Sequence, residues 1–327
     1  MKFDIDKSFG IFAHFTPPLS RGLIALSHAV QRFRPKFPSS VGYKRVTAGG
    51  CPAVLAEPKG AEENLPCLIY FHGGGFVFRA GGYHFANAAQ YCTGARCKVL
   101  FVDYPLAPKA SLSRIASACL SAYGEIIERA EEWGIDLSRI AVGGDSAGGF
   151  LAADVIFRAR AQKLPLPCFA MLIYPVLDRR MVTPSMKEFT DTPMWNARLN
   201  KKMWTYCRPD FPSPAEAEDV SFFPPAYIET AQFDCLKDEG ENFAARLKEQ
   251  GVSVQYNATN GTMHGFDIAR KSPITRAAVA ARTAALKRAF YPSKQNCPAH
   301  MRQLIVVKRR LIVIKWLAPR HFNAAAL

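Results

Sequence analysis

The first residue with a clear capacity for chemistry is a serine in a glycine-rich turn. Ser146 is central to the stretch GGDSAGG at 143–149, which contains Gly-X-Ser-X-Gly. A strand-like run at Arg139–Gly143 leads into it, and a helix-like pattern follows at Ala147–Ala161. Glycines at such a turn permit the sharp bend that exposes a serine hydroxyl. We therefore predict a nucleophile. The alternatives are a plain glycine-rich turn and a phosphate loop, although a Walker loop is excluded because no Gly-Lys-Ser/Thr follows.

A second glycine-rich stretch, HGGGF at 72–76, follows the apolar run Cys67–Phe71. Consecutive glycines let backbone N–H groups converge on one oxygen, as acyl transfer requires when charge grows on a carbonyl oxygen. A flexible loop is the alternative, whereas a dinucleotide cradle is disfavoured because Gly-X-Gly-X-X-Gly is absent. The predicted oxyanion-hole donors are the N–H groups of Gly74, Gly75 and Ala147. The residues expected to support the two loops are His72, Gly73, Gly144 and Asp145.

A serine hydroxyl needs a base, and on a strand–turn–helix scaffold the base follows the nucleophile in the chain. Of the seven histidines, three lie after Ser146: His264, His300 and His321. The last two fall in a basic C-terminal segment. His264 follows the last predicted strand, in a loop that can reach a serine at a strand end, so we predict that it is the base.

The base in turn needs a carboxylate between Ser146 and His264. Asp234 closely follows the strand-like run Ala226–Ala231, at the strand end where sites assemble in open α/β sheets. Asp234 is therefore our prediction, with Asp238 as the second choice. The remaining acids have ordinary roles: Asp238 and Glu239 open a helix, and Asp210 and Asp219 are expected to face solvent.

Short apolar runs alternate with helical patterns along the chain, which predicts a doubly wound α/β sheet. The central runs are almost wholly apolar, as in strands buried on both faces of a parallel sheet. The predicted strands are Tyr43–Thr47, Ala53–Glu57, Cys67–Phe71, Lys98–Asp103, Arg139–Gly143, Phe169–Tyr174, Ala226–Ala231 and Val252–Tyr256. The predicted helices are Tyr83–Thr93, Ile115–Trp133, Ala147–Ala161, Asp238–Gln250 and Pro273–Phe290.

Two stretches interrupt this alternation and are expected to form a lid. Residues 1–40 are helical and aromatic, and residues 177–221 form a long insertion rich in proline, methionine and aromatic side chains. The expected organisation is therefore a helical cap from 1–40 and 177–221, and a catalytic domain over 41–292. A basic tail of unclear structure occupies 293–327.

The composition excludes fewer classes of function than the motifs do. The 327 residues carry a net charge of +15, and nearly half of this excess lies in 293–327, which holds seven cations and no acidic residue. Nine scattered cysteines without a Cys-X-X-Cys pair argue against a zinc site and suggest a reduced compartment. We expect no metal and no cofactor. With neither a signal-peptide pattern nor a run of about 18 apolar residues, we expect a cytoplasmic protein.

Together these motifs resemble the hormone-sensitive-lipase-like esterases, the α/β-hydrolase group that includes bacterial acetyl esterases. HGGGF, DYPLAP at 103–108, GDSAGG and HGF at 264–266 occur in the order typical of that family. The resemblance covers about residues 40–290. It implies an α/β-hydrolase fold with a mostly parallel eight-stranded sheet and a helical cap. It also implies a carboxylic-ester hydrolase with Ser146 as nucleophile, His264 as base and Asp234 as the residue that orients the base.

The chain departs from the family pattern at supporting positions. Lys109 and the pair Leu112-Ser113 replace a usual Glu and Phe-Pro, and Cys235 replaces the proline that usually follows the catalytic aspartate. These changes touch no predicted catalytic group. Short- to medium-chain acyl esters are the expected substrates. An amide or formamide hydrolase, or a non-catalytic ligand receptor on the same scaffold, remains as an alternative.

The expected partners are a small ester and, in one interpretation, a second copy of the chain. We expect no nucleic acid partner. Two β-prone runs around Lys308, Arg309 and Arg310 could contact an anionic membrane, but an accessory hairpin or an unfolded end is the stronger interpretation.

Overall fold

The computed structural model describes residues 2–30, 33–61 and 64–292. One compact unit spans Met1–Phe290. The predictions made for the basic segment 293–327, including membrane contact, lie outside the described residues.

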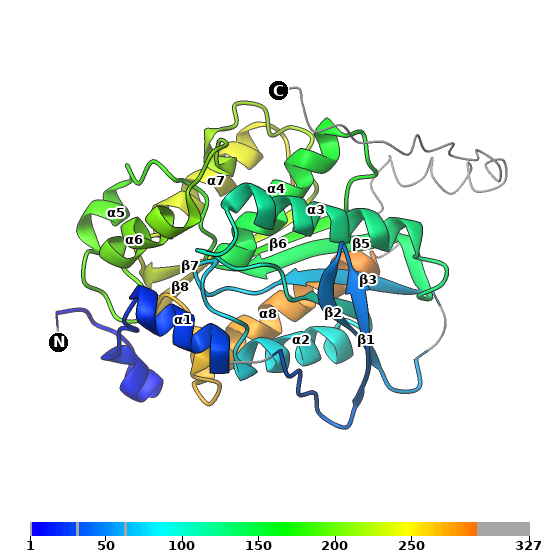
Figure 1. Ribbon diagram of the computed structural model, residues 1–327, viewed down its shortest axis with the longest axis horizontal. Helices are drawn as coiled ribbons and strands as arrows, with labels where there is room; N and C mark the ends of the chain where they lie inside the picture. The colour runs from blue at the N-terminus through cyan, green and yellow to red at the C-terminus, as the bar shows by residue number, and fades with distance from the viewer. Residues whose placement is uncertain (1, 31–32, 62–63, 293–327) are drawn as a thin grey trace. The chain divides into compact units, whose positions relative to one another are not determined.

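The core of this unit is one eight-stranded sheet with the order β1-β2-β4-β3-β5-β6-β7-β8 (Figure 1). β2 pairs antiparallel with both β1 and β4, and every other neighbouring pair is parallel. This confirms the predicted α/β-hydrolase fold. The strands are β1 (Val41–Ala48), β2 (Cys51–Pro58), β3 (Leu65–Phe71), β4 (Lys98–Val102), β5 (Ile135–Asp145), β6 (Phe169–Ile173), β7 (Ala226–Phe233) and β8 (Val254–Met263).

The central strands are buried on both faces, as their apolar composition predicts. In β3, Cys67, Ile69 and Phe71 point into one hydrophobic core, whereas Leu68 and Tyr70 point into the other. All five side chains are fully buried. A strand with two packed faces cannot shift its register by one residue without moving every side chain to the wrong core, so the loops at its end are held accurately.

Helices cover the two faces of the sheet (Figure 1). On one face lie α3 (Leu112–Glu128), α4 (Ala147–Ala161) and α7 (Lys237–Glu249). On the other face lie α2 (Gly82–Gly94) and α8 (Pro273–Phe290). Parallel strands joined through such helices all end at the same edge of the sheet, and this edge receives the loops that follow β3, β5, β7 and β8.

Two segments outside the alternating pattern gather at one end of the sheet, as Figure 1 shows for α1, α5 and α6. Their elements are η1 (Lys7–Ala13), α1 (Arg21–Val30), α5 (Pro184–Glu188), α6 (Ala197–Cys207) and η2 (Pro214–Glu216), with η3 (Phe266–Ile268) following β8. The N–H of Met194 donates to the carbonyl of Phe15 at 2.7 Å. Lys2 pairs with Asp191 at 2.7 Å. The N-terminal segment and the 177–221 insertion are thus joined to each other.

Most element boundaries lie within three residues of the predicted ones, and three differ by more. β5 begins at Ile135 rather than Arg139, because polar Asp136 and Ser138 interrupt its first residues, which therefore lack a continuous apolar signature. β8 continues to Met263 through polar residues for the same reason. α3 ends at Glu128 rather than Trp133, since the chain turns away from the helix towards Gly134, whose φ is +59°.

Candidate active site

The serine at the β5–α4 turn has the strained backbone predicted from its glycine-rich surroundings. Ser146 has φ +54° and ψ −118°, and its N–H donates to the Ile173 carbonyl at 2.8 Å. Flanking glycines make this turn possible. A Cβ at Gly148 would lie 1.9 Å from the Phe71 carbonyl oxygen, and one at Gly144 would lie 2.4 Å from the same atom. The turn is therefore packed so closely on the end of β3 that neither position can hold a side chain.

Three residues from distant parts of the chain meet at this turn. His264 directly follows β8, and its Nε2 lies 2.8 Å from the Ser146 Oγ. Asp234 directly follows β7, and its Oδ2 lies 2.7 Å from the His264 Nδ1. With the proton on Nδ1, the imidazole donates to the carboxylate and accepts from the serine hydroxyl. The structure thus brings together the three residues that the sequence singled out.

Asp234 is completely buried, and a second contact orients it. Its Oδ1 accepts a hydrogen bond from the Leu236 N–H at 2.9 Å. A buried carboxylate held by both a backbone donor and an imidazole is a well-ordered acceptor.

The other acidic residues considered from sequence lie in different surroundings. Asp238 accepts from the Ser185 N–H at 2.7 Å. Glu239 accepts from the N–H groups of Leu177 and Asp178 at 2.7 and 2.9 Å, so it holds the start of the insertion and does not cap a helix. Asp210 and Asp219 are exposed, as expected. None of these four carboxylates is hydrogen-bonded to His264 within the described chain.

The HGGGF loop follows β3 and has the conformation that an anion-binding loop needs. Gly74 and Gly75 have φ +113° and +58°, and the Gly74 carbonyl accepts from the N–H groups of Val77 and Phe78. Within the described residues, no protein acceptor takes the N–H of Gly74, of Gly75 or of Ala147 at the start of α4. These three groups are therefore available to a ligand oxygen.

Asp145 connects this loop to the serine turn. Its Oδ1 accepts from the Tyr70 hydroxyl at 2.6 Å and from the Gly73 N–H at 3.0 Å, and its Oδ2 lies 3.2 Å from the His84 Nε2. Burial alone would raise the pKa of this carboxyl, but the charge and hydrogen bond of His84, with the Tyr70 hydrogen bond, outweigh burial and set the pKa at about 2. The ionised carboxylate thus holds one loop against the other.

His72 packs within the loop and contacts neither His264 nor Ser146 through a hydrogen bond. Its Nδ1 lies 2.7 Å from the Gly73 carbonyl oxygen, and its ring stacks on Tyr104 with centroids 4.4 Å apart. The Tyr104 hydroxyl donates to the His72 carbonyl at 2.6 Å. Burial is the main reason that the pKa of His72 is lowered to about 3. The side chain is therefore neutral near pH 7, consistent with the expected supporting position.

One residue of the insertion, Trp195, covers the meeting point of these loops. A Cβ placed on Gly75 would lie 2.7 Å from the outer edge of the indole, and the Trp195 and His264 ring centroids lie 6.2 Å apart. The indole Nε1 donates to the Asn200 Oδ1 at 3.2 Å. Ser146 is only 5% exposed. The sequence predicts an insertion rich in aromatic side chains, but nothing local indicates which of them lies over the site.

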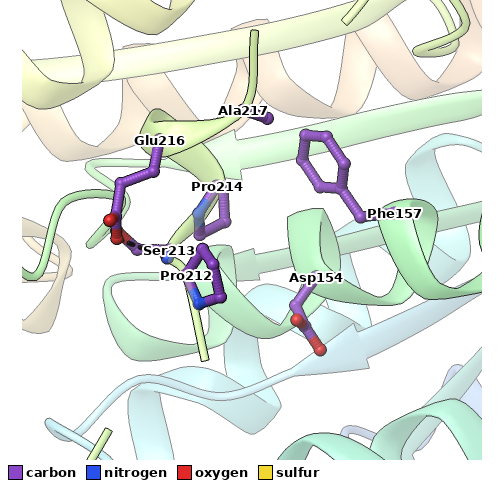
Figure 2. Close-up of a pocket in the computed structure, with 7 residues that line it drawn as sticks. All are labelled: Asp154, Phe157, Pro212, Ser213, Pro214, Glu216 and Ala217. Carbon is purple, nitrogen blue, oxygen red and sulfur yellow. Dashed lines mark hydrogen bonds between the residues drawn. The ribbon is translucent and has the colours of Figure 1, made fainter. Parts of the chain in front are cut away.

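A separate surface pocket of about 320 Å³ lies beside the middle of α4 (Figure 2). Asp154 and Phe157 line it from the helix. The residues that line it from the loop around η2 are Pro212, Ser213, Pro214, Glu216 and Ala217. Asp154 is seven residues along α4 from the helix start, which places it about 10 Å from the serine turn. Burial raises the pKa of the Asp154 carboxyl to about 6, against the opposing effect of Arg158. This pocket is not part of the Ser146 site.

Residues 68–268 match the protein family described as having the alpha/beta hydrolase fold. The chain is 33% identical over 264 residues to "Carboxylesterase NlhH" of Mycobacterium tuberculosis, which covers 77% of this chain and 82% of that protein. It is 32% identical over 210 residues to "Ethyl acetate hydrolase" of Pseudomonas putida, covering 61% of this chain and 65% of that one.

A solved structure, "Bacterial Heroin Esterase", is similar with a TM-score of 0.77 and 29% identity, covering 89% of this chain and 99% of that one.

Two further findings concern the described residues alone. No helix among them is long and apolar enough to span a membrane. Their eight cysteines form no disulfide with one another.

Proposed function

The chain belongs to the hormone-sensitive-lipase-like family of α/β hydrolases and is a carboxylic-ester hydrolase, and we propose that it works as a serine esterase. The observation that carries this proposal is the pair of short contacts through one imidazole, 2.8 Å to the Ser146 Oγ and 2.7 Å to the Asp234 Oδ2. A base joined to a nucleophile on one side and to a carboxylate on the other is the arrangement that activates a hydroxyl.

In the acylation step, the Ser146 oxygen attacks the carbonyl carbon of the ester while its proton moves to the His264 Nε2. The carbonyl oxygen becomes an oxyanion, and the N–H groups of Gly74, Gly75 and Ala147 are the proposed donors to it. Collapse of this intermediate breaks the ester C–O bond. The imidazolium gives its proton to the departing alcohol, and an acyl-enzyme remains.

Deacylation repeats the chemistry with water as nucleophile. His264 removes a proton from the water as the water oxygen bonds to the acyl carbon. The second intermediate breaks its bond to the Ser146 oxygen, which recovers the proton, and the carboxylic acid leaves. Asp234 keeps the imidazole in the required tautomer and stabilises its charge in both halves, because the carboxylate accepts from Nδ1 throughout.

Short- to medium-chain acyl esters are the proposed substrate class. Trp195 lies against Gly75 and close to His264, so a bulky group entering there meets an indole that is itself held by Asn200. An apolar wall of this kind favours an uncharged ester and limits the length of one substituent.

Steady-state hydrolysis of p-nitrophenyl acetate and butyrate by Ser146→Ala tests the proposal. We expect turnover to fall by at least about 10³-fold, because the nucleophile is lost. Ser253→Ala, an exposed serine before β8, is the matched control and should behave as the unmodified chain. If Ser146→Ala retained turnover comparable to the control, the assignment of the nucleophile would be wrong.

A further inference from the structure

A second group of buried charges, which the proposed mechanism does not use, begins three residues after His264. Asp267 in η3, Arg282 in α8 and Glu229 in β7 are each completely buried. The Arg282 Nη1 donates to the Asp267 Oδ2 at 2.6 Å, and Nη2 donates to the Glu229 Oε1 at 2.5 Å. One guanidinium thus joins two carboxylates across three elements of the fold.

The remaining polar atoms of this group also have partners. The Asp267 Oδ2 accepts from the Asn87 Nδ2 at 2.9 Å, and the Glu229 Oε2 accepts from the Tyr227 hydroxyl at 2.6 Å. Two carboxylates and one guanidinium leave a formal excess of one negative charge away from water. Burying charge is costly, and apolar side chains would hold the same elements together equally well, so an unbalanced buried charge calls for a further reason.

Tyr174 links this group to the imidazole. Its hydroxyl donates to the Asp267 Oδ1 at 2.6 Å, and its own N–H donates to the Glu229 carbonyl at 2.6 Å. Its ring packs against the His264 ring with centroids 4.9 Å apart and planes at 63°. The backbone of Tyr174 has φ +33°, a conformation that a non-glycine residue adopts only when its surroundings impose it. The tyrosine is therefore held at both ends, with its ring against the base.

We propose that Tyr174 is a positioning residue for His264, held by the Asp267–Arg282–Glu229 group, and that the excess negative charge of this group favours the imidazolium formed during the reaction. This inference rests on the proposed function, in which His264 gains a proton in each half of the cycle. A ring pressed against the imidazole limits its rotation away from the Ser146 Oγ, and small displacements of a base are costly in rate. The carboxylate that the Tyr174 hydroxyl holds acts on the charged imidazole through its negative charge.

The charged, polar and aromatic groups that face His264 and Asp267 come from several elements of the fold. The groups around His264 are Asp234 after β7, Ser146 at the β5–α4 turn, Tyr174 after β6 and Trp195 of the insertion. Around Asp267 they are Arg282 from α8, Asn87 from α2 and Tyr174, while Tyr91 of α2 contacts Arg282. Tyr83 and Asp145 also act electrostatically on Tyr174.

Two substitutions in the full chain separate positioning from packing. Tyr174→Phe keeps the ring but removes the hydroxyl that anchors it. We expect kcat for p-nitrophenyl butyrate to fall about tenfold, with KM within about twofold, because the ground-state contacts of the substrate are unchanged. Tyr123→Phe is the matched control, since this buried tyrosine also loses one hydroxyl hydrogen bond, to the Pro165 carbonyl, away from His264. This control should keep both kinetic constants.

Asp267→Asn tests the charge. Removing a negative charge near His264 makes the imidazolium less favourable, so the acid limb of the pH profile of kcat/KM should move to lower pH by about half a unit or more. Tyr174→Phe should move the limb less than Asp267→Asn does. The unfolding temperature of Tyr174→Phe and of Asp267→Asn is measured alongside the kinetics.

A purely structural role predicts a different pattern. If Tyr174→Phe and Asp267→Asn changed the unfolding temperature but left kcat and the acid limb like those of Tyr123→Phe, the inference would be overturned. Ser146→Ala separates this failure from that of the proposed function. If Ser146→Ala inactivated the protein while Tyr174→Phe and Asp267→Asn had no effect on the kinetics, the proposed triad would stand and only the positioning role would be lost.

Discussion

The Nε2 atom of His264 lies 2.8 Å from the Oγ atom of Ser146, although 118 positions separate the two residues in the chain. This distance depends on two strands that run in the same direction. β5 ends at Asp145 and β8 ends at Met263, so each functional side chain is the first residue after its strand. Asp234 repeats the pattern after β7. A parallel sheet therefore assembles the three side chains at one edge.

Asp234→Asn should lower kcat by about 10³- to 10⁴-fold with little change in KM, because an amide favours the wrong imidazole tautomer. Stopped-flow or steady-state kinetics on p-nitrophenyl butyrate measure this. Asp238→Asn is the control: its carboxylate contacts the Ser185 N–H and not His264, so this variant should keep most of the activity. The reverse ranking of the two variants would assign the orienting carboxylate to Asp238.

Trp195→Phe and Trp195→Ala should progressively widen the acyl range. We expect the ratio of kcat/KM for p-nitrophenyl octanoate to that for the acetate to rise about tenfold in Trp195→Ala, since the lost indole opens space beside Gly75. Trp133→Phe, a buried tryptophan just before the start of β5 and so at the other end of that strand from Ser146, controls for general loss of packing. An unchanged ratio in both Trp195 variants would show that this side chain does not limit the acyl chain in the substrate pocket.

His72→Phe should make the protein less sensitive to mild acid. The pKa of His72 is lowered to about 3 by burial, so between about pH 6.5 and pH 3 the unfolded chain binds a proton that the folded chain does not. Stability is therefore lost as pH falls through this window, by about 1.4 kcal/mol per pH unit from this group.

Urea unfolding at pH 7 and pH 4.5 measures this effect. The free energy of unfolding of His72→Phe should fall less between the two pH values, by about 2–3 kcal/mol, than that of the unmodified chain. His14→Gln, an exposed histidine, should lose as much as the unmodified chain does. Equal losses in His72→Phe and the unmodified chain would contradict a neutral, buried His72.

Gly148→Ala should destabilise the fold by about 3 kcal/mol or more, because a Cβ there would lie 1.9 Å from a backbone oxygen of β3. Gly124→Ala, in the middle of α3 where a Cβ meets nothing within 4 Å, should instead stabilise by about 0.5–1 kcal/mol through helix propensity. Urea denaturation gives both values. If the two variants had equal stability, the close contact between the serine turn and β3 would be wrong.

The sequence predicts much of this site because its main residues follow strands. Ser146, Asp234 and His264 each lie at the end of an apolar run, and parallel strand ends share an edge, so their meeting can be argued without coordinates. The fold class follows from the same alternation of runs and helices. The order of the strands, with β4 between β2 and β3, does not follow from the pattern.

Contacts made by side chains between elements are not predictable in this way. Tyr174 and Asp267 are 93 positions apart, and neither the strand before Tyr174 nor the turn around Asp267 indicates that they touch. Arg282 looks like an ordinary cation in an alanine-rich helix until its complete burial is seen. The place of Trp195 depends on how the insertion folds back over the sheet, which no periodicity encodes.

The most direct test of the central claim is covalent labelling with a fluorophosphonate followed by mass spectrometry of the proteolysed protein. An activated serine reacts with this reagent, whereas an ordinary hydroxyl does not. We predict one adduct, on Ser146, that is lost in Ser146→Ala and forms much more slowly in His264→Ala. Labelling at another serine, or labelling of Ser146 at the same rate without His264, would contradict the claim that this histidine activates this serine.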